Sequence, residues 1–383
     1  LYRALHWEFR ALQGAGAHEV RRGVARIGSG DPVAAYHAAS ALWLAGAGRS
    51  ARKALGAIDP GALPAYLRWR WSSLHGHALA DAGEFEAAAA AYESAFARAA
   101  PSEREPVRVH WASALLELGR PSEVRERLEA LDPTRLEPVD LGWALELRGR
   151  AELELGNPGR ALERLDAAEA TAPQGARRFA IAQARAQALG RTGRHAEAAE
   201  RLADALSDAP EEDRSYALHE QAVAWLEADV LDAAERVLEE LLLDPDYPHH
   251  AEATADLAEG RLRRGDLPEA RETAARALDA GAVAPACLTL GTVAYEYFDV
   301  DEAIVWFERA VSASRAGDPT WVAAHQLLAD AHAQRGPAAA ELLLLHARQA
   351  LAHTEPGSEW IAPLEAHVER ARRWLGGADR WLN

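Results

Sequence analysis

A short stretch in the second half of the chain carries residue types that bind metal ions. It contains His249 and His250, followed by Glu252 and Asp256. Imidazole and carboxylate groups are common ligands of zinc, and several of them must converge on one point to hold the ion. The stretch supplies no confirmed third ligand on one helix face, so we expect no metal site. We expect the two histidines to begin a helix after Pro248.

The sequence lacks the motifs of the common enzymatic chemistries. It has no glycine-rich phosphate loop, no nucleophile elbow and no paired motif of cysteine and histidine. Cys287 is the only cysteine, which excludes an internal disulfide and a multi-cysteine metal site, and we expect its thiol to fill a helix core. We therefore predict a protein that is not an enzyme and needs no cofactor or metal.

A second group of candidate residues stands at fixed distances before a series of turn residues. These turn residues follow one another at intervals of 33 to 38 positions, with a period of about 36. They are Gly46, Gly83, Gly119, Gly156, Gly193, Asp229, Gly265, Phe298 and Gly336. A regular period of this length indicates an array of similar structural units that stack on one another.

The residues six, ten and thirteen positions before each turn would lie on one face of the helix that leads into it. This face is polar with a few aromatic side chains, a composition that suits the recognition of a peptide. The alternative is an ordinary solvated face. Our candidate partner-binding residues are Arg70, His77, Trp143, Glu146, Arg150, Gln183, Gln187, Tyr216, His219, Glu252, Glu259, Thr292, Gln326 and Asp330.

The elements that would position these residues are paired helices. Helix-forming residues dominate the chain, and no valine-rich run suggests a strand. A small residue stands seven positions before each turn, where the two helices of a pair would cross closely: Ala39, Gly76, Ala112, Gly149, Ala186, Ala222, Ala258, Gly291 and Ala329. Apolar residues stand five, nine and twelve positions after most turns and would form one stripe of the second helix. The pattern predicts an all-α protein.

The two ends of the array fit the pattern less well. In residues 1–34, Val20, Val24 and Ile27 occupy the right columns, but Glu8 stands where a small residue is expected. Residues 336–356 need about two extra positions to restore the register. The stretch 357–376 follows a proline and a glycine, with Ser358 as a candidate N-cap, and we expect it to cover the last apolar face.

The columns resemble the tetratricopeptide repeat, which has a small residue, a turn glycine seven positions later, and an alanine, a large apolar residue, a second alanine and a closing proline after it. The clearest copies are 142–175 and 179–212. The resemblance implies a right-handed α-solenoid of about ten helix-turn-helix repeats over residues 1–356. Within it, 1–34 is a weak first repeat, about 35–317 are clear repeats and 318–356 is an irregular last one. A C-terminal capping helix and tail would occupy 357–383.

Departures from the family pattern predict local differences in structure. The period is nearer 36 than the usual 34, so we expect slightly longer helices or loops. The short step of 33 residues predicts a kink near 278–286. Asp229 and Phe298 replace the turn glycine in two repeats.

The same resemblance implies a role in binding proteins or peptides, in a concave groove lined by the first helix of each pair. A subgroup of the family that binds the C-terminal carboxylates of chaperones uses lysines and asparagines on these helices. Lys53 is the only lysine here, and no asparagine falls on a first helix, so we do not expect that specialisation. We expect a scaffold or adaptor. Two alternatives stay open: a sensor or regulatory segment of a larger signalling or transcription-regulating protein, and a self-assembling structural component.

Negative charge is concentrated in one part of the chain. The formal net charge of −17 divides into +1 for residues 1–200, −15 for 201–300 and −3 for 301–383. A strongly acidic segment repels nucleic acid and attracts a basic protein surface, which we expect as the partner. The alternative is that the outer helix faces are simply acidic. The chain shows no signal peptide and no membrane-spanning run, so we expect a cytoplasmic protein, with a processed secreted or periplasmic form as the alternative.

Overall fold

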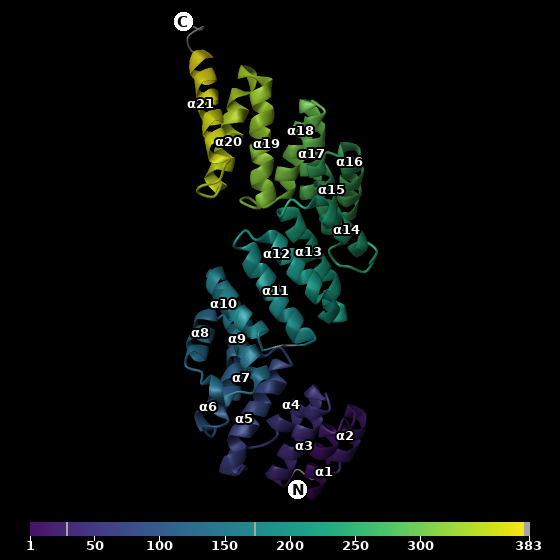
Figure 1. Ribbon diagram of the computed structural model, residues 1–383, viewed down its shortest axis with the longest axis vertical. Coiled ribbons are helices and arrows are strands. Elements are labelled where there is room, and N and C mark those ends of the chain that lie inside the picture. Colours follow the sequence, from purple (N-terminus) through teal and green to yellow (C-terminus); the bar gives the residue numbers. More distant parts are fainter. Residues whose placement is uncertain (28–29, 172–173, 379–383) are drawn as a thin grey trace. The chain divides into compact units, whose positions relative to one another are not determined.

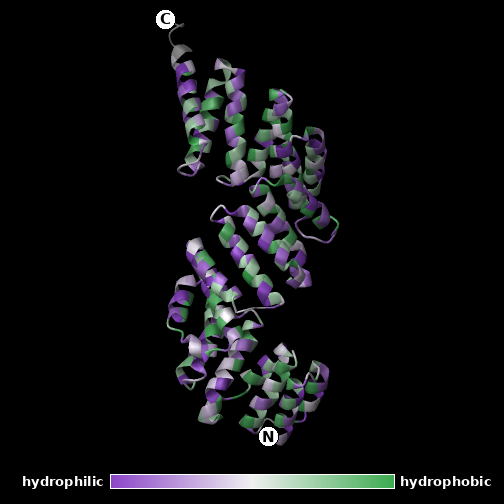
Figure 2. Ribbon diagram, in the orientation of Figure 1, coloured by the Kyte–Doolittle hydropathy of each residue, from purple (hydrophilic) through white to green (hydrophobic). Residues whose placement is uncertain are grey.

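A computed structural model describes residues 1–27, 30–171 and 174–378. Within these ranges the regular secondary structure is entirely helical and includes 21 α-helices. Figure 1 shows these helices in their order along the chain. Figure 2 shows that many helices have one hydrophobic and one hydrophilic side, which is the pattern expected where one side packs against neighbours. The all-α solenoid arrangement predicted from the repeat columns is confirmed. The contacts divide the chain into two compact units, Leu1–Gly193 (unit 1) and Arg194–Asn383 (unit 2).

Unit 1 is built from helical hairpins in which each second helix also contacts the first helix of the next hairpin. This arrangement buries a continuous core along the hairpins. Its helices are α1 (Tyr2–Leu12), α2 (Ala17–Val24), α3 (Pro32–Leu44), α4 (Gly48–Gly56), α5 (Ala65–Ala80), α6 (Phe85–Arg98), α7 (Arg104–Glu117), α8 (Pro121–Glu129), α9 (Pro138–Glu154), α10 (Pro158–Glu169) and α11 (Ala176–Gly190).

Unit 2 repeats the same arrangement and ends in an additional helix that packs against α20. Its helices are α12 (His195–Ala205), α13 (Arg214–Glu227), α14 (Leu231–Leu241), α15 (His250–Arg264), α16 (Leu267–Ala280), α17 (Val283–Glu296), α18 (Val300–Ala313), α19 (Pro319–Arg335), α20 (Ala340–His353) and α21 (Ile361–Ala378). His250 begins α15, so the prediction of a helix start after Pro248 is confirmed.

The turn residues predicted from the period all have a positive φ angle. Seven are glycines, and the other two, Asp229 and Phe298, have φ angles of 58° and 63°. After α9, the amide of Asn157 donates to the carbonyl of Glu152 at 2.8 Å, which closes the helix end in the manner of a Schellman motif. The same bond between the residue after the turn and the carbonyl five positions earlier recurs along the chain.

Small residues in the first helices let large side chains of the second helices approach. A Cβ atom added at Gly291 would lie 2.5 Å from the ring of Phe307, and one added at Gly76 would lie 2.7 Å from the ring of Tyr92. Where the small residue is alanine, the partner is smaller than these rings, as in the fully buried pair Ala222 and Leu238. In these hairpins the smaller residue therefore accompanies the larger ring, whereas Gly149 in the α9–α10 hairpin packs against a leucine, Leu165.

The connections between hairpins explain both departures from the family period. Short 3-10 turns lengthen several of them: η1 (Pro60–Ala62), η2 (Pro133–Arg135), η3 (Leu206–Asp208) and η4 (Glu211–Asp213). The short step near 278–286 has the opposite cause, because only Gly281 and Ala282 separate α16 from α17. Gly281 ends α16 with a φ of 111°, and Cys287 in the following helix is fully buried, as expected.

The ends of the chain keep the repeat pattern with local changes. Val20 is fully buried, whereas Glu8 accepts a hydrogen bond from His37 at 2.6 Å instead of filling a helix crossing. Near the other end, the turn η5 (Pro337–Ala339) adds residues before α20, whose buried side chains are displaced by the two positions that the sequence indicated. The last helix begins at Ile361, so Ser358 is not its N-cap as expected. Ser358 Oγ instead accepts a hydrogen bond from the backbone N–H of Trp360 in the turn before the helix.

Candidate functional site

A diagonal series of side chains crosses the first helices of five successive hairpins. It consists of Trp43 on α3, His77 on α5, His110 on α7, Trp143 on α9 and Arg177 on α11. These residues stand 3, 6, 9, 13 and 16 positions before the turn residues of their hairpins. The offset grows by three or four at each step, which is one helical turn. From one first helix to the next, the contributing residue therefore lies one helical turn further from the end of its helix.

Each member of the diagonal contacts the next. The rings of Trp43 and His77 stack with their centroids 5.1 Å apart, and His77 meets His110 edge to face at 4.3 Å. His110 meets the ring of Trp143 at 4.8 Å, and the guanidinium of Arg177 lies 4.9 Å from the centroid of that indole. Separations of this kind are typical of favourable aromatic and cation–π pairs.

These rings line a recess of about 300 Å³, which we call the aromatic recess. Tyr92, from the second helix α6, forms part of its wall, and its hydroxyl bonds to His77 Nδ1 at 2.8 Å. The rings of Trp43, His77, His110 and Trp143 are only partly buried. Smaller side chains complete the lining, which comprises Trp43, His77, Ala80, Asp81, Phe85, Tyr92, His110, Ser113, Ala114 and Trp143.

Burial keeps the imidazoles of the recess uncharged at neutral pH. Desolvation lowers the pKa of His77 to about 4, and desolvation, His77 and Arg177 together lower the pKa of His110 to about 3. Burial also raises the pKa of Tyr92, so its hydroxyl, which is hydrogen-bonded to His77, keeps its proton. Among the described residues that line the recess, only Asp81 then carries a charge. Its carboxylate accepts a hydrogen bond from Trp43 Nε1 at 3.0 Å.

Glu146 holds the last member of the diagonal in place. Its side chain is 2% exposed, and its Oε2 accepts a hydrogen bond from Arg177 Nη1 at 2.7 Å. Arg150 lies 4.0 Å from the same carboxylate and 3.7 Å from Glu117. The sequence placed Glu146 on an accessible face; the structure corrects this, because the carboxylate is buried between α9 and α11 and positions Arg177 on Trp143.

The other unit 1 candidates lie outside the recess. Arg70 is exposed, stacks on Trp69 at 4.7 Å and pairs with Glu103 at 3.7 Å. Gln183 and Gln187 lie on α11, and Gln187 is exposed. Of the candidates chosen from the sequence in unit 1, the structure brings His77 and Trp143 into one site. His110 lies between these two residues, and Trp43 stacks on the other side of His77. The sequence selection missed Trp43 and His110.

In unit 2, three candidate residues gather around Tyr247. His219 bonds through Nδ1 to the Tyr247 hydroxyl at 2.8 Å and through Nε2 to Asp256 at 2.7 Å. Tyr216, which is 41% exposed, meets the Tyr247 ring edge to face at 5.4 Å. Glu252 lies on the same helix as Asp256, with its carboxylate 4.0 Å from the imidazole of His249. No group of ligands able to hold a metal occurs among the residues that the structure describes.

The remaining unit 2 candidates do not form one site. Glu259 pairs with Arg263 at 3.7 Å, and Thr292 donates to the carbonyl of Leu288 in its own helix. Asp330 bonds to His367 of α21 at 2.6 Å. Gln326 was expected on an accessible face but is only 8% exposed, because α19 is enclosed by neighbouring helices on more than one side.

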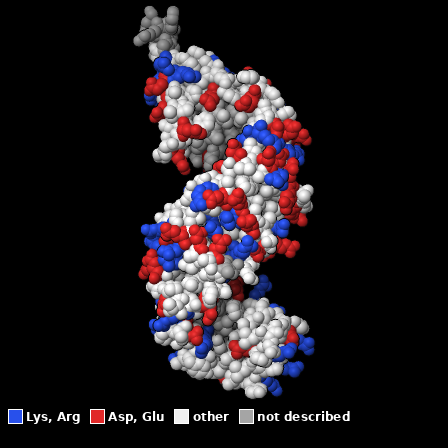
Figure 3. All heavy atoms as spheres, in the orientation of Figure 1, with Lys and Arg blue, Asp and Glu red and all other residues white. Residues whose placement is uncertain are grey.

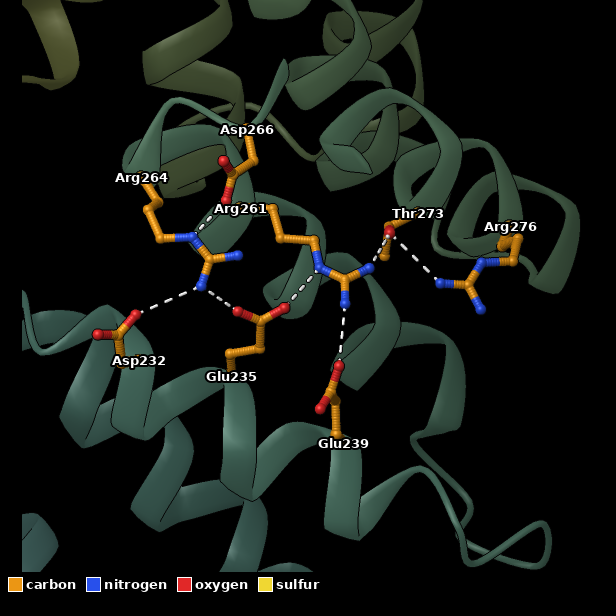
Figure 4. A network of polar contacts seen from close by, with 8 residues as sticks. All are labelled: Asp232, Glu235, Glu239, Arg261, Arg264, Asp266, Thr273 and Arg276. Atoms are coloured by element: carbon orange, nitrogen blue, oxygen red, sulfur yellow. Dashed lines mark hydrogen bonds and ion pairs between the residues drawn. The ribbon is translucent and has the colours of Figure 1, made fainter. Parts of the chain in front are cut away.

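Part of the negative charge of residues 201–300 is neutralised by internal ion pairs. Figure 4 shows Arg261 between Glu235 and Glu239, at 2.8 and 3.0 Å, and Arg264 between Glu235, Asp232 and Asp266. Figure 3 shows acidic and basic side chains side by side over α14 to α16. The eight basic residues of this segment are nevertheless far fewer than its 23 acidic ones, so a large negative excess remains.

No protein-family model and no curated protein sequence matches this chain. Several solved structures resemble it. The apo form of the quorum sensor NprR from Bacillus thuringiensis is 14% identical, with a TM-score of 0.51 over 83% of this chain and 98% of that one. A tetratricopeptide repeat protein from Parabacteroides merdae is also 14% identical, with a TM-score of 0.46 over 73% of this chain and 98% of that one. The Cut9–Hcn1 assembly reaches 13% identity and a TM-score of 0.45 over 95% of both chains.

Taken with the repeat columns, the similarity to the quorum sensor NprR shows that the chain has the α-solenoid fold of tetratricopeptide repeats. None of its described helices is long and apolar enough to cross a membrane.

Proposed function

We propose that this chain is a non-catalytic scaffold or adaptor that binds a protein or an extended peptide on the face formed by its first helices. One observation carries the proposal: the aromatic recess in unit 1. The rings of Trp43, His77, His110 and Trp143 are only partly buried, and they come from four different helices to line one recess. Aromatic side chains gathered around an open recess are the usual anchors of protein recognition, because they offer a large contact area with little loss of conformational freedom.

The surroundings of the recess support an equilibrium binding role. His77 and His110 are held by neighbouring rings, so their positions are set before a partner arrives. Preorganised side chains lose little entropy on binding, which leaves more of the contact energy as affinity. The recess is open to solvent on one side and has a volume suited to a single side chain of a partner.

The acidic segment supports a partner with a basic surface. Residues 201–300 keep a net charge of −15 even though Arg261 and Arg264 form internal ion pairs. Charge of one sign over a large surface speeds the encounter with a partner of the opposite sign and adds less to the final affinity. We propose that this segment accelerates association with a basic protein.

Selection from a random peptide-display library tests the proposed function. The selected peptides are measured for affinity against the chain, a Trp143→Ala variant and a Ser113→Tyr variant that fills the recess without removing any of its rings. We expect both variants to weaken binding by about tenfold or more, the effect of losing one binding hot spot. A matched Trp360→Ala variant, which removes a 38% exposed tryptophan of unit 2, is expected to bind as the unaltered chain does.

Circular dichroism of each variant shows whether it remains folded, and Ser113→Tyr keeps the test valid if Trp143→Ala proves unstable. Peptides that bind all folded variants equally would show that the recess is not the recognition site. Failure to select any peptide or protein domain that binds would contradict the proposed function.

A further inference from the structure

We propose that the aromatic recess binds a basic side chain, an arginine or a lysine, of the partner. This inference rests on the proposed function and specifies the chemistry that the recess recognises. It concerns Trp43, His77, His110, Trp143 and Asp81.

The rings of the recess favour a cation. The face of an aromatic ring carries the negative part of its quadrupole, and indoles attract cations most strongly. Trp43 and Trp143 both line the recess, from α3 and α9. Trp143 already holds one guanidinium, that of Arg177, at 4.9 Å from its ring centroid, so the protein itself uses this type of contact at the edge of the site.

The charge on the lining of the recess also favours a cation. Asp81 is exposed and is the one charged residue among those that line the recess. By accepting the Trp43 N–H at 3.0 Å, its carboxylate increases the electron density of the indole and strengthens the attraction of that ring for a cation. A basic group in the recess would thus meet a carboxylate and an enriched ring together.

The histidines do not oppose a cation. His77 and His110 are neutral at physiological pH because burial disfavours their charged forms. His77 is hydrogen-bonded through Nδ1 to the Tyr92 hydroxyl, which fixes the orientation of its ring. Two protonated imidazoles would repel a basic side chain, whereas neutral ones add polarisable walls without charge.

A basic side chain also complements the apolar and charged groups of the recess better than an apolar side chain does. The aliphatic stem of lysine or arginine can contact Ala80, Ala114 and Phe85, while the charged end reaches the carboxylate of Asp81. An apolar side chain of similar size would cover part of that carboxylate and give it no partner, which is unfavourable. An acidic side chain would be repelled by Asp81.

Titration with single amino-acid derivatives tests this inference without any knowledge of the partner. The probes are N-acetyl-arginine amide, the uncharged N-acetyl-citrulline amide of nearly the same shape, and N-acetyl-phenylalanine amide. Binding is followed by NMR through the indole N–H signals of Trp43 and Trp143, assigned with Trp43→Phe and Trp143→Phe variants. We expect the arginine probe to shift both signals and to bind about fivefold more tightly than the citrulline probe, the ratio that one cation–π contact supplies.

An Asp81→Asn variant separates charge from shape, because asparagine can still accept the Trp43 N–H. We expect it to reduce the preference for arginine over citrulline to about twofold or less. The matched control is Glu93→Gln, which removes one negative charge from an exposed position on α6 outside the recess, and it should leave the preference unchanged.

Four results would overturn the inference: equal binding of arginine and citrulline, stronger binding of the phenylalanine probe, an Asp81→Asn variant that keeps the full preference, or no shift of either indole at about 50 mM probe. If library-selected peptides bind through the recess without a basic residue, this inference fails and the proposed function stands. If the arginine probe binds at both indoles and no peptide or protein is ever selected, the proposed function fails and the chemistry of the recess stands.

Discussion

Replacing Gly291 by alanine should destabilise unit 2 although alanine is the better helix former. An added Cβ would lie 2.5 Å from two ring carbons of Phe307, whose side chain is fully buried. Forcing an extra methyl group into a packed core costs about 1–3 kcal/mol. The change from glycine to alanine inside a helix returns about 1 kcal/mol. We therefore expect a net loss of up to about 2 kcal/mol in the free energy of unfolding.

Gly159→Ala serves as the control, since a Cβ at this exposed position of α10 meets no atom within 4 Å. Urea unfolding followed by circular dichroism should show Gly159→Ala to be neutral or stabilising and Gly291→Ala to be destabilising. The double variant Gly291→Ala with Phe307→Leu recreates the pairing of Ala222 with Leu238. It should be more stable than the sum of its single changes by about 1 kcal/mol or more. An additive cycle, or a Gly291→Ala variant as stable as the original chain, would refute the matched-size reasoning.

Three further predictions concern the turns, the buried histidines and the charge. Phe298→Gly should raise the free energy of unfolding by up to about 1 kcal/mol, because it relieves a positive φ of 63° at a residue that is 86% exposed. Thermal unfolding should show a higher melting temperature, and an unchanged or lower melting temperature would contradict this prediction. Burial lowers the pKa of His325 and His346 to about 4, so the folded state binds fewer protons than the unfolded state. The urea concentration at the midpoint of unfolding should therefore fall as the pH drops from about 6.5 towards 4. A midpoint that does not change with pH would argue against buried neutral imidazoles. Association with a basic peptide should slow as salt is raised, and a rate independent of ionic strength would count against the role of residues 201–300.

The sequence was sufficient to predict the features that depend on local backbone geometry. A helix that must stop and reverse within a few residues needs a residue with a positive φ, so the period located the turns from Gly46 to Gly336, including those at Asp229 and Phe298. The two-position offset before α20 followed from the same columns, because buried residues of a helix keep their spacing. These features recur in each repeat, and repetition makes them visible in a single sequence.

The same reasoning predicted only part of the aromatic recess. A search at constant offsets finds residues that occupy the same place in every repeat, and it selected His77 and Trp143. Trp43 and His110 stand at other offsets, because the diagonal moves by one helical turn from each hairpin to the next. The recess could have been predicted from the aromatic and histidine residues that stand 3, 6, 9 and 13 positions before the turn residues of successive repeats. The burial of Glu146 had no such signal, since it depends on Arg177, which is 31 positions away.

A site built along a diagonal makes recognition depend on several hairpins at once. The walls of the recess come from α3, α5, α6, α7 and α9, so one partner side chain contacts four successive hairpins of unit 1. A small change in the stacking of any two hairpins would separate rings that now lie 4.3 to 5.1 Å apart. Binding in the recess must therefore favour one arrangement of these hairpins over others, by the linkage between a ligand and the conformation it prefers. For the same reason, the crossings at Gly76 and Gly149, which set how closely each hairpin closes, influence recognition although neither residue lines the recess.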